Sequence, residues 1–184
     1  MLPILHQSLW RDEAFSVLVS EKPLSEIFLL VTKDVQAPLY YFILHYWMLI
    51  FGNSEATIRS LSVLFHFALG ILILLFLYKL TKNVAVSIFT SLAILFNPFL
   101  LTYAFEARPY SLLAFLITLA LYLFISKRFL SASIVFTLSV FTHNFAMFSL
   151  IGLLIYWLLR RGREIMQKDK VVIKPRSITI FRLF

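Results

Sequence analysis

The chain has 184 residues and no cysteine; 61% of its residues are hydrophobic, only 14% are charged, and its mean hydropathy is +0.90. A soluble domain is about half apolar and about a quarter charged, so this composition excludes an ordinary soluble protein and indicates an integral membrane protein, while the lack of cysteine excludes disulfides and thiolate metal sites. The net charge of +8 does not predict a nucleic-acid partner, because the basic residues follow the ends of apolar runs, where membrane topology explains them.

Residues 1–55 are expected to form a loop outside the cytoplasm that carries interfacial helices. Within this loop the run 38–51 is apolar but short for a membrane crossing. It also contains aromatic residues of the kind that favour the membrane–water interface. We therefore expect a helix that lies in the interface or re-enters the membrane without crossing it. The aromatic residues are Tyr40, Tyr41, Tyr46 and Trp47.

Five longer apolar runs follow, each long enough, or nearly so, to cross about 30 Å of hydrocarbon with about 20 residues. The second run is interrupted by Asn97-Pro98, and the last two are separated by a turn at His143. The predicted fold is an all-α, polytopic membrane helical bundle with about five crossings. Its membrane region is residues 56–160, and residues 161–184 are a basic cytoplasmic tail. The runs are 56–78, 84–102, 109–126, 129–142 and 145–159.

The positions of the basic residues predict which ends of these runs face the cytoplasm. If all five runs cross, twelve of the seventeen lysines and arginines lie on one face, which the positive-inside rule assigns to the cytoplasm. Glu106, Arg108 and His143 then lie on the opposite face, and Asp12 joins them because we expect 38–51 not to cross. We therefore expect a multi-pass protein of the cell membrane with an extracytoplasmic site. The twelve are Lys79, Lys82, Lys127, Arg128, Arg160, Arg161, Arg163, Lys168, Lys170, Lys174, Arg176 and Arg182.

Two adjacent carboxylates, Asp12 and Glu13, stand near the start of this hydrophobic chain. Ionised acids close to hydrocarbon are costly, so such a pair is a functional-site hypothesis by default. The plainer alternative is a pair of acids in the first turn of a helix, where the helix dipole stabilises negative charge. Both interpretations place the pair at a helix start beside the membrane.

Several short motifs occur in a fixed order along the chain. The motifs are LWRDEA at 9–14, DVQAPLYY at 34–41, FGNSE at 51–55 with Arg59, NP at 97–98, YAFEARPY at 103–110 and FTHN at 141–144. Together they resemble the first two extracytoplasmic loops of the GT-C membrane glycosyltransferases, in the branch of the protein O-mannosyltransferases and aminoarabinose transferases. The resemblance covers residues 8 to about 160.

The resemblance implies a catalytic role for the first-loop acids. In that family the donor is a sugar on a polyprenyl phosphate, and the acceptor carries a hydroxyl group. Carried over, Asp12 is the general base that deprotonates the acceptor, and Glu13 orients Asp12 or helps to position the acceptor. Glu106 is the second acid of the cavity, and Glu106 and Asp12 are candidate ligands for a divalent metal ion. Direct displacement with one base inverts the anomeric configuration.

The remaining candidate site residues would bind substrate. Arg108, with Arg11 or Lys33 as helpers, is the candidate partner of the donor phosphate, because a guanidinium binds phosphate oxygens through two hydrogen bonds. Asp34 is a candidate third acid of the cavity. His143, in the turn that resembles a Thr-His-Tyr turn of the family, is a further candidate. Plainer roles for these residues are ion pairing at the interface, a helix end and a turn.

The chain departs from the family pattern at Gln36-Ala37-Pro38. Members commonly read His-Pro-Pro or Lys-Pro-Pro at this place, so we assign position 36 no contact with a metal or a phosphate. Members also have a transmembrane helix before the Asp-Glu loop and more helices after the region covered here. We therefore expect the chain to be a portion of such an enzyme, truncated at both ends. Such a portion need not be active by itself.

Two other functions stay open at this point. A non-catalytic membrane protein that binds a lipid-phosphate head group, such as a flippase-like or scaffold subunit, would need the same cations without a catalytic base. A transporter would place charged residues in the middle of its spans, and the middles of these runs carry almost no charge. The glycosyltransferase is therefore the leading prediction.

The resemblance also leads us to expect that Asp12 and Glu106 open into one cavity.

Overall fold

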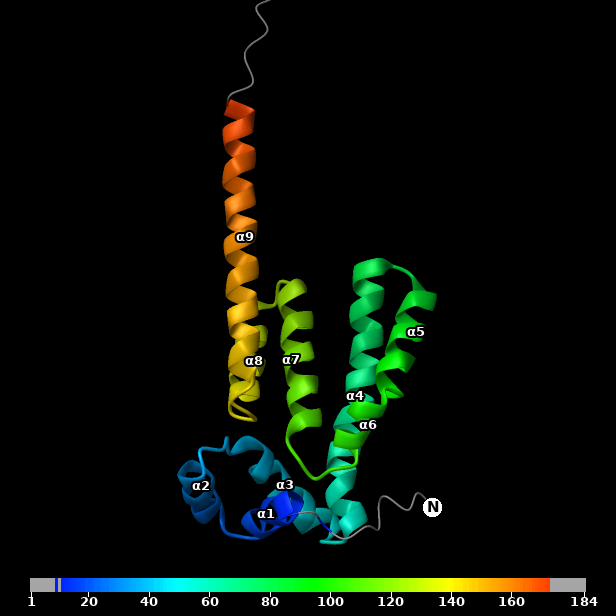
Figure 1. The fold of residues 1–184 in the computed structure, drawn as a ribbon, viewed down its shortest axis with the longest axis vertical. Coiled ribbons are helices and arrows are strands. Elements are labelled where there is room, and N and C mark those ends of the chain that lie inside the picture. The colour runs from blue at the N-terminus through cyan, green and yellow to red at the C-terminus, as the bar shows by residue number, and fades with distance from the viewer. Residues whose placement is uncertain (1–8, 10, 173–184) are drawn as a thin grey trace, which may run out of the picture. The chain divides into compact units, whose positions relative to one another are not determined.

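The computed structural model describes residue 9 and residues 11–172, and all nine elements of this described part are α-helices (Figure 1). This confirms the predicted all-α class. The chain forms two compact units, residues 1–146 and 147–184, which are described separately. The helices are α1 (Arg11–Ser20), α2 (Leu24–Lys33), α3 (Leu39–Phe51), α4 (Glu55–Thr81), α5 (Val84–Leu95), α6 (Pro98–Ala104), α7 (Tyr110–Ile125), α8 (Phe129–Val140) and α9 (Ala146–Val172).

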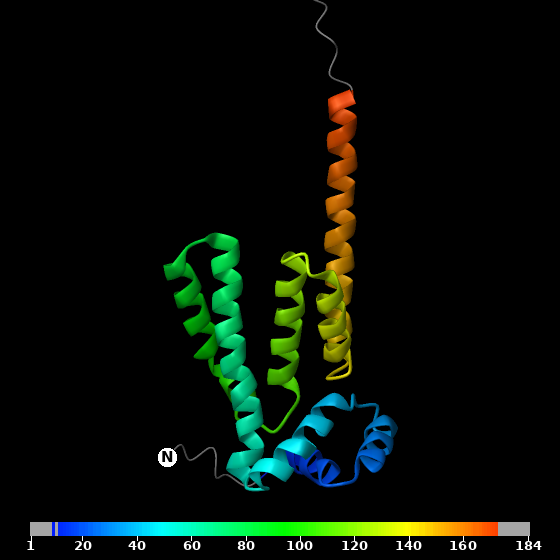
Figure 2. The same cartoon turned by 180° about the vertical axis from the view of Figure 1, so that it is seen from behind.

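In the first unit, the short helices α1, α2 and α3 gather at one end of a set of longer helices (Figures 1 and 2). Helix α4 packs against α5 and α7, and α7 packs against α8. Helix α3 contacts α1, α2 and α4, so it links the short helices to the longer ones. The run 38–51 is therefore helical, as its sequence predicted, and it belongs to the group of short helices.

The longest helix of the first unit is α4, with 27 residues, which correspond to about 40 Å along its axis. It begins after Ser54, whose hydroxyl accepts a hydrogen bond from the backbone N–H of Thr57 and so satisfies one of the free donors at the helix start. It ends at Thr81, and the next residue, Lys82, adopts the left-handed conformation with φ of 56°. These local signals explain why the run that follows Phe51 folds as one continuous helix.

The second apolar run is divided between α5 and α6, which are bent by 59° relative to each other. The break lies at Asn97-Pro98, as predicted. The Asn97 side chain accepts hydrogen bonds from the backbone N–H groups of Phe99 and Leu100, and Pro98 occupies the first helical position. Both features start a new helix, and the proline cannot continue the preceding one.

Among the described residues, α4 is the one helix that is long and apolar enough to cross a membrane, and the bent pair α5–α6 is a second candidate if it counts as one span. Helix α4 also exposes large apolar side chains along its length, including Leu64, Phe67, Ile71 and Leu75. Helices α3, α7, α8 and the stretch Ala146–Tyr156 of α9 are apolar but shorter. The five predicted crossings therefore stay a prediction.

The hydrophobic core of the first unit joins segments that are far apart in the sequence. Val17 from α1, Tyr40 from α3, Ile58 from α4 and Leu112 from α7 pack together with Ala107 of the segment between α6 and α7. All five are buried, so removing them from water stabilises the meeting point of the short and long helices. A second cluster of Val19, Ile27, Val31 and Tyr41 holds α1, α2 and α3 together.

Candidate functional site

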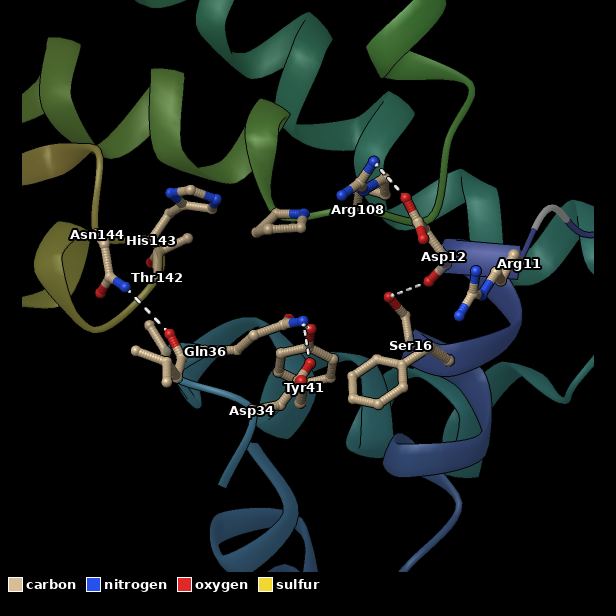
Figure 3. A pocket seen from close by; sticks show the side chains of 14 residues that line it. Arg11, Asp12, Ser16, Asp34, Gln36, Tyr41, Arg108, Thr142, His143 and Asn144 are labelled. Atoms are coloured by element: carbon tan, nitrogen blue, oxygen red, sulfur yellow. Dashed lines mark hydrogen bonds and ion pairs between the residues drawn. The ribbon is translucent and has the colours of Figure 1, made fainter. Parts of the chain in front are cut away.

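Asp12 and Arg108 form an exposed ion pair at the junction of α1 and the 105–109 segment, which connects α6 to α7. Arg108 Nη1 lies 3.0 Å from Asp12 Oδ2, and the side chains are 31% and 61% exposed, respectively. The Arg108 guanidinium also lies over the ring of Tyr110, 4.9 Å from its centroid, which is the geometry of a cation–π contact. An accessible carboxylate and an accessible cation are thus held side by side (Figure 3).

Glu13, the next residue of α1, occupies a different environment. Its carboxylate accepts hydrogen bonds from Arg59 Nε at 3.0 Å and from Arg59 Nη2 at 2.8 Å, and Glu13 and Arg59 are each only 1% exposed. The backbone N–H of Ala107 donates a third hydrogen bond, 2.9 Å long, to Glu13 Oε1. One buried carboxylate therefore joins α1, α4 and the 105–109 segment. Because Glu13 follows Asp12 and Ala107 precedes Arg108, this joint fixes the two backbone segments that carry the exposed pair.

The exposed pair lines a cavity of about 540 Å³, which lies within the range of small-molecule sites (Figure 3). Its walls come from α1, the 105–109 segment, the α2–α3 connection and the turn between α8 and α9. Its lining combines charged and polar side chains with the aromatic rings of Phe15, Tyr41 and His143. The lining residues are Arg11, Asp12, Phe15, Ser16, Asp34, Val35, Gln36, Ala37, Tyr41, Arg108, Pro109, Thr142, His143 and Asn144.

A strained turn after α2 forms the cavity wall that contains Asp34 and Gln36. The backbone N–H of Gln36 bonds to the carbonyl of Val31, and that of Val35 bonds to the carbonyl of Thr32, which is the Schellman pattern of a helix end. This pattern places Val35 in the left-handed conformation, with φ of 55°, where a β-branched residue is unfavourable. The turn directs the chain from α2 into α3 and brings residues 34–37 to the cavity.

The turn between α8 and α9 completes the cavity and is tied to the α2–α3 connection. Asn144 Nδ2 donates to the carbonyl of Val35 at 3.1 Å, and the backbone N–H of Leu39 donates to the carbonyl of Phe141 at 2.9 Å. His143 lies beside Tyr110, with ring centroids 5.6 Å apart. Burial, together with the positive charge of Arg108, lowers the pKa of His143 below its ordinary value, so its ring is neutral near pH 7.

Five of the eight candidate site residues line this cavity: Arg11, Asp12, Asp34, Arg108 and His143. The other three, Glu13, Glu106 and Lys33, do not line it. Lys33 is the last residue of α2 and is exposed. Glu13 is buried in the ion pair with Arg59. The expectation that Asp12 and Glu106 open into one cavity is therefore not met, because in this structure only Asp12 lines the cavity.

Glu106 lies within electrostatic reach of the site although it does not line the cavity. Partial burial raises the pKa of its carboxyl group; Arg108 opposes this rise, and the Glu13 and Asp12 carboxylates add to it. Its carbonyl oxygen accepts a hydrogen bond from the backbone N–H of Arg108 at 2.8 Å, so it helps to shape the turn that presents Arg108. Glu106 thus acts on the exposed pair through charge and backbone geometry.

The divalent metal ion stays a prediction. Of its two candidate ligands, Asp12 is paired with Arg108, and Glu106 does not line the same cavity. Across residues 9 and 11–172, no group of three or more histidine, aspartate or glutamate side chains is placed to hold a metal.

The cavity also contains residues that the sequence did not single out. Phe15, Ser16, Gln36, Tyr41 and Asn144 line it. Gln36 and Tyr41 fall inside the DVQAPLYY motif, so this motif contributes to the cavity lining, although the departure at position 36 left Gln36 without a predicted role. Phe15 and Ser16 follow the Asp-Glu pair on α1 and carry no signal of their own.

A second, apolar cavity of about 410 Å³ lies among α4, α6 and α7, and Tyr110 belongs to its lining. The Tyr110 ring also contacts His143 and Arg108, which line the first cavity. The lining residues are His66, Leu69, Phe99, Leu100, Tyr103, Tyr110, Ser111, Leu113, Ala114, Ile117 and Phe145.

Comparisons of the chain with protein-family models, with curated proteins and with solved structures found no match.

Proposed function

We propose that this protein is a membrane glycosyltransferase that transfers a sugar from a polyprenyl-phosphate donor to a hydroxyl-bearing acceptor, with inversion. The observation that carries the proposal is the Asp12–Arg108 pair at the cavity, with its 3.0 Å separation and its exposed carboxylate. The reaction needs a base for the acceptor and a cation for the departing phosphate, and these two groups supply them. The ordered motifs described above support the same class.

In the proposed reaction, the donor phosphate replaces Asp12 as the partner of Arg108, and the freed Asp12 carboxylate turns to the acceptor on the opposite face of the sugar. The acceptor hydroxyl donates a hydrogen bond to the Asp12 carboxylate. As the acceptor oxygen forms its bond to the anomeric carbon, its proton moves to Asp12. The bond from the anomeric carbon to the phosphate oxygen breaks, and its electron pair leaves with the polyprenyl phosphate. The attack comes from the face opposite the leaving group, so the configuration is inverted.

Glu13 acts in this scheme as a positioning residue. Its carboxylate is buried against Arg59 and the Ala107 amide, and it does not contact the cavity. By tying α1 to the 105–109 segment it sets the separation of Asp12 from Arg108. This is the orienting role that the resemblance implied, reached through the backbone on both sides of the pair.

The apolar cavity offers a place for the lipid part of the donor. A prenyl chain is hydrocarbon, and this cavity is lined mostly by apolar and aromatic side chains. Tyr110 lines this cavity and its ring contacts Arg108, so a phosphate bound to Arg108 would lie near one end of the lipid site. The proposal also keeps the expected topology, a multi-pass protein of the cell membrane with the Asp12 cavity on the extracytoplasmic side.

A second candidate function is the non-catalytic binding of a lipid-phosphate head group. The observation that favours it is that Arg108 and Arg11 both line the polar cavity, next to the apolar one. Such a protein would bind polyprenyl phosphate in the same place and transfer nothing. The two functions therefore differ in the role of Asp12 alone.

The test is transfer of radiolabelled sugar by the chain reconstituted in lipid vesicles, or by any longer protein that contains it. The donors are polyprenyl-phosphate sugars, and binding of each donor is measured in parallel. With Asp12→Asn, turnover is expected to fall by about 10²–10⁴-fold, because the substitution keeps the size and removes the proton acceptor. Donor binding is expected to change little. Near-normal turnover of Asp12→Asn would overturn the catalytic role, and binding without any transfer would favour the second function.

A further inference from the structure

Three side chains form a hydrogen-bonded row along one wall of the polar cavity (Figure 3). Gln36 Nε2 donates to Asp34 Oδ2 at 2.8 Å, and the Tyr41 hydroxyl donates to Gln36 Oε1. We call Asp34, Gln36 and Tyr41 the amide wall. The row runs from the end of α2 to the first turns of α3, and the two ends of this segment are fixed by the helices they belong to.

The hydrogen bonds fix which groups the amide wall presents. An ionised carboxylate only accepts hydrogen bonds, so Gln36 must turn its NH₂ group to Asp34 and its oxygen to Tyr41. Burial raises the pKa of Tyr41 to about 12, so the hydroxyl keeps its proton and can donate it to Gln36. A carboxylate has room for further donors, and an amide nitrogen has a second hydrogen. The amide wall therefore offers hydrogen-bond acceptors and a donor close together.

The charges of the cavity are divided between its walls. Both arginines of the lining, Arg11 and Arg108, belong to α1 and the 105–109 segment, where Asp12 pairs with Arg108, whereas the amide wall contains a carboxylate and no cation. A phosphate is attracted to the arginines and repelled by Asp34. Hydroxyl groups both donate and accept, so they match the carboxylate and the amide of this wall. Phe15, which packs edge-on against Tyr41 with ring centroids 6.2 Å apart, adds an apolar surface beside them.

We infer that the amide wall is a recognition subsite for the hydroxyl groups of a neutral sugar, and that Asp34 excludes sugars that carry a carboxylate. The inference deepens the proposed transferase function and rests on it for the place of the sugar. Two sources share this chemistry, the sugar of the donor and a carbohydrate acceptor.

The first experiment measures sugar binding without any transfer. The chain in lipid nanodiscs is titrated with glucose, galactose, mannose and glucuronate, and binding is followed by saturation-transfer NMR. At least one of the neutral sugars is expected to bind, and glucuronate is expected to bind more weakly than any that does. Asp34→Asn and Gln36→Ala are expected to weaken binding of the neutral sugar about tenfold or more, as for the loss of a hydrogen bond to a charged or paired group. Asp34→Asn is also expected to reduce the preference against glucuronate.

The matched control is Glu26→Gln, which removes a carboxylate from the exposed first turn of α2, away from the cavity. It is expected to leave sugar binding unchanged. The inference is wrong if no neutral sugar binds, if glucuronate binds as well as the neutral sugars, or if both amide-wall variants bind like the unsubstituted chain. It is also wrong if these variants lower the Tm and leave binding unchanged, since the row would then only brace the turn.

The two sources are separated by kinetics where transfer is observed. If the donor sugar occupies the subsite, Gln36→Ala raises the KM for the polyprenyl-phosphate sugar, and if the acceptor does, it raises the KM for a carbohydrate acceptor. Transfer with both KM values unchanged in Gln36→Ala contradicts the inference and leaves the proposed function intact. If free sugar binds in an Asp34-dependent way but no donor supports transfer, the result supports the sugar subsite and contradicts the proposed transferase function.

Discussion

Glu13 and Arg59, 46 positions apart in the sequence, form a buried ion pair with two hydrogen bonds of 3.0 and 2.8 Å. Both side chains have left water almost completely, so each depends on the other for the free energy lost on burial. The pair matters to the candidate site because Glu13 also accepts the hydrogen bond from the Ala107 amide, next to Arg108. The Glu13 carboxylate therefore contributes both to the stability of the fold and to the geometry of the candidate site.

Removing the cation of this pair should strongly destabilise the protein. In Arg59→Met the Glu13 carboxylate stays buried without its cation, which costs about 3–5 kcal/mol of unfolding free energy. Glu13→Gln should also destabilise, because Arg59 then stays buried without its carboxylate, although the amide oxygen can still accept from the Ala107 N–H. Thermal unfolding in detergent, followed by circular dichroism, measures both. Arg128→Met, at an exposed arginine, is the control, and an Arg59→Met variant as stable as this control would contradict the structure.

Arg108 should affect donor binding more than stability. Arg108→Ala removes the cation that we propose for the phosphate, so binding of a polyprenyl-phosphate sugar should weaken about tenfold or more. Arg108→Lys keeps the charge and loses the two-pronged geometry, so it should recover part of the binding. Vesicle-binding assays with labelled donor measure both variants. If Arg108→Ala binds the donor as tightly as the unsubstituted chain does, Arg108 does not bind the donor phosphate.

His143 should make stability depend on pH in one direction. Burial and the charge of Arg108 lower the pKa of His143 in the folded chain below the ordinary 6.5. Between the folded pKa and 6.5, the unfolded chain therefore binds a proton that the folded chain does not. The free energy of unfolding rises with pH across this interval, and the His143 contribution to it is lost as the pH falls through the folded pKa. The Tm of the unsubstituted chain should drop more between pH 7.5 and about 5 than the Tm of His143→Gln. Parallel curves for the two would show that His143 does not contribute.

The side of the membrane that each end of α4 faces can be measured by cysteine labelling, since the chain has no cysteine of its own. Lys33 and Thr81 are both exposed, so cysteines there should react readily. Lys33→Cys in intact cells should react with an impermeant maleimide, and Thr81→Cys should react only after permeabilisation. Labelling of both from the same side would mean either that α3 crosses together with α4 or that neither helix crosses, and the predicted topology would then be wrong.

The parts of the fold that the sequence predicted depend on local signals. The helical class follows from long apolar runs, and the break between α5 and α6 follows from Asn97-Pro98, where the cap and the proline act within a few residues. The helix at 38–51 could also be predicted, because its apolar and aromatic residues are contiguous. The number of membrane crossings could not be predicted from length, since α7 and α8 have 16 and 12 residues and a crossing helix needs about 20.

The site depends on contacts that the sequence could not predict. Successive residues of an α-helix point about 100° apart, so of the adjacent acids Asp12 and Glu13 one can face the cavity and the other the core, and the sequence does not say which. Only the position of Arg59 on α4 decided that Glu13 is buried. The composition and the motifs therefore determined a helical, hydrophobic chain with acids at a helix start. The tertiary structure decided which acid faces the cavity and which side chains face it, because both depend on packing between segments far apart in the chain.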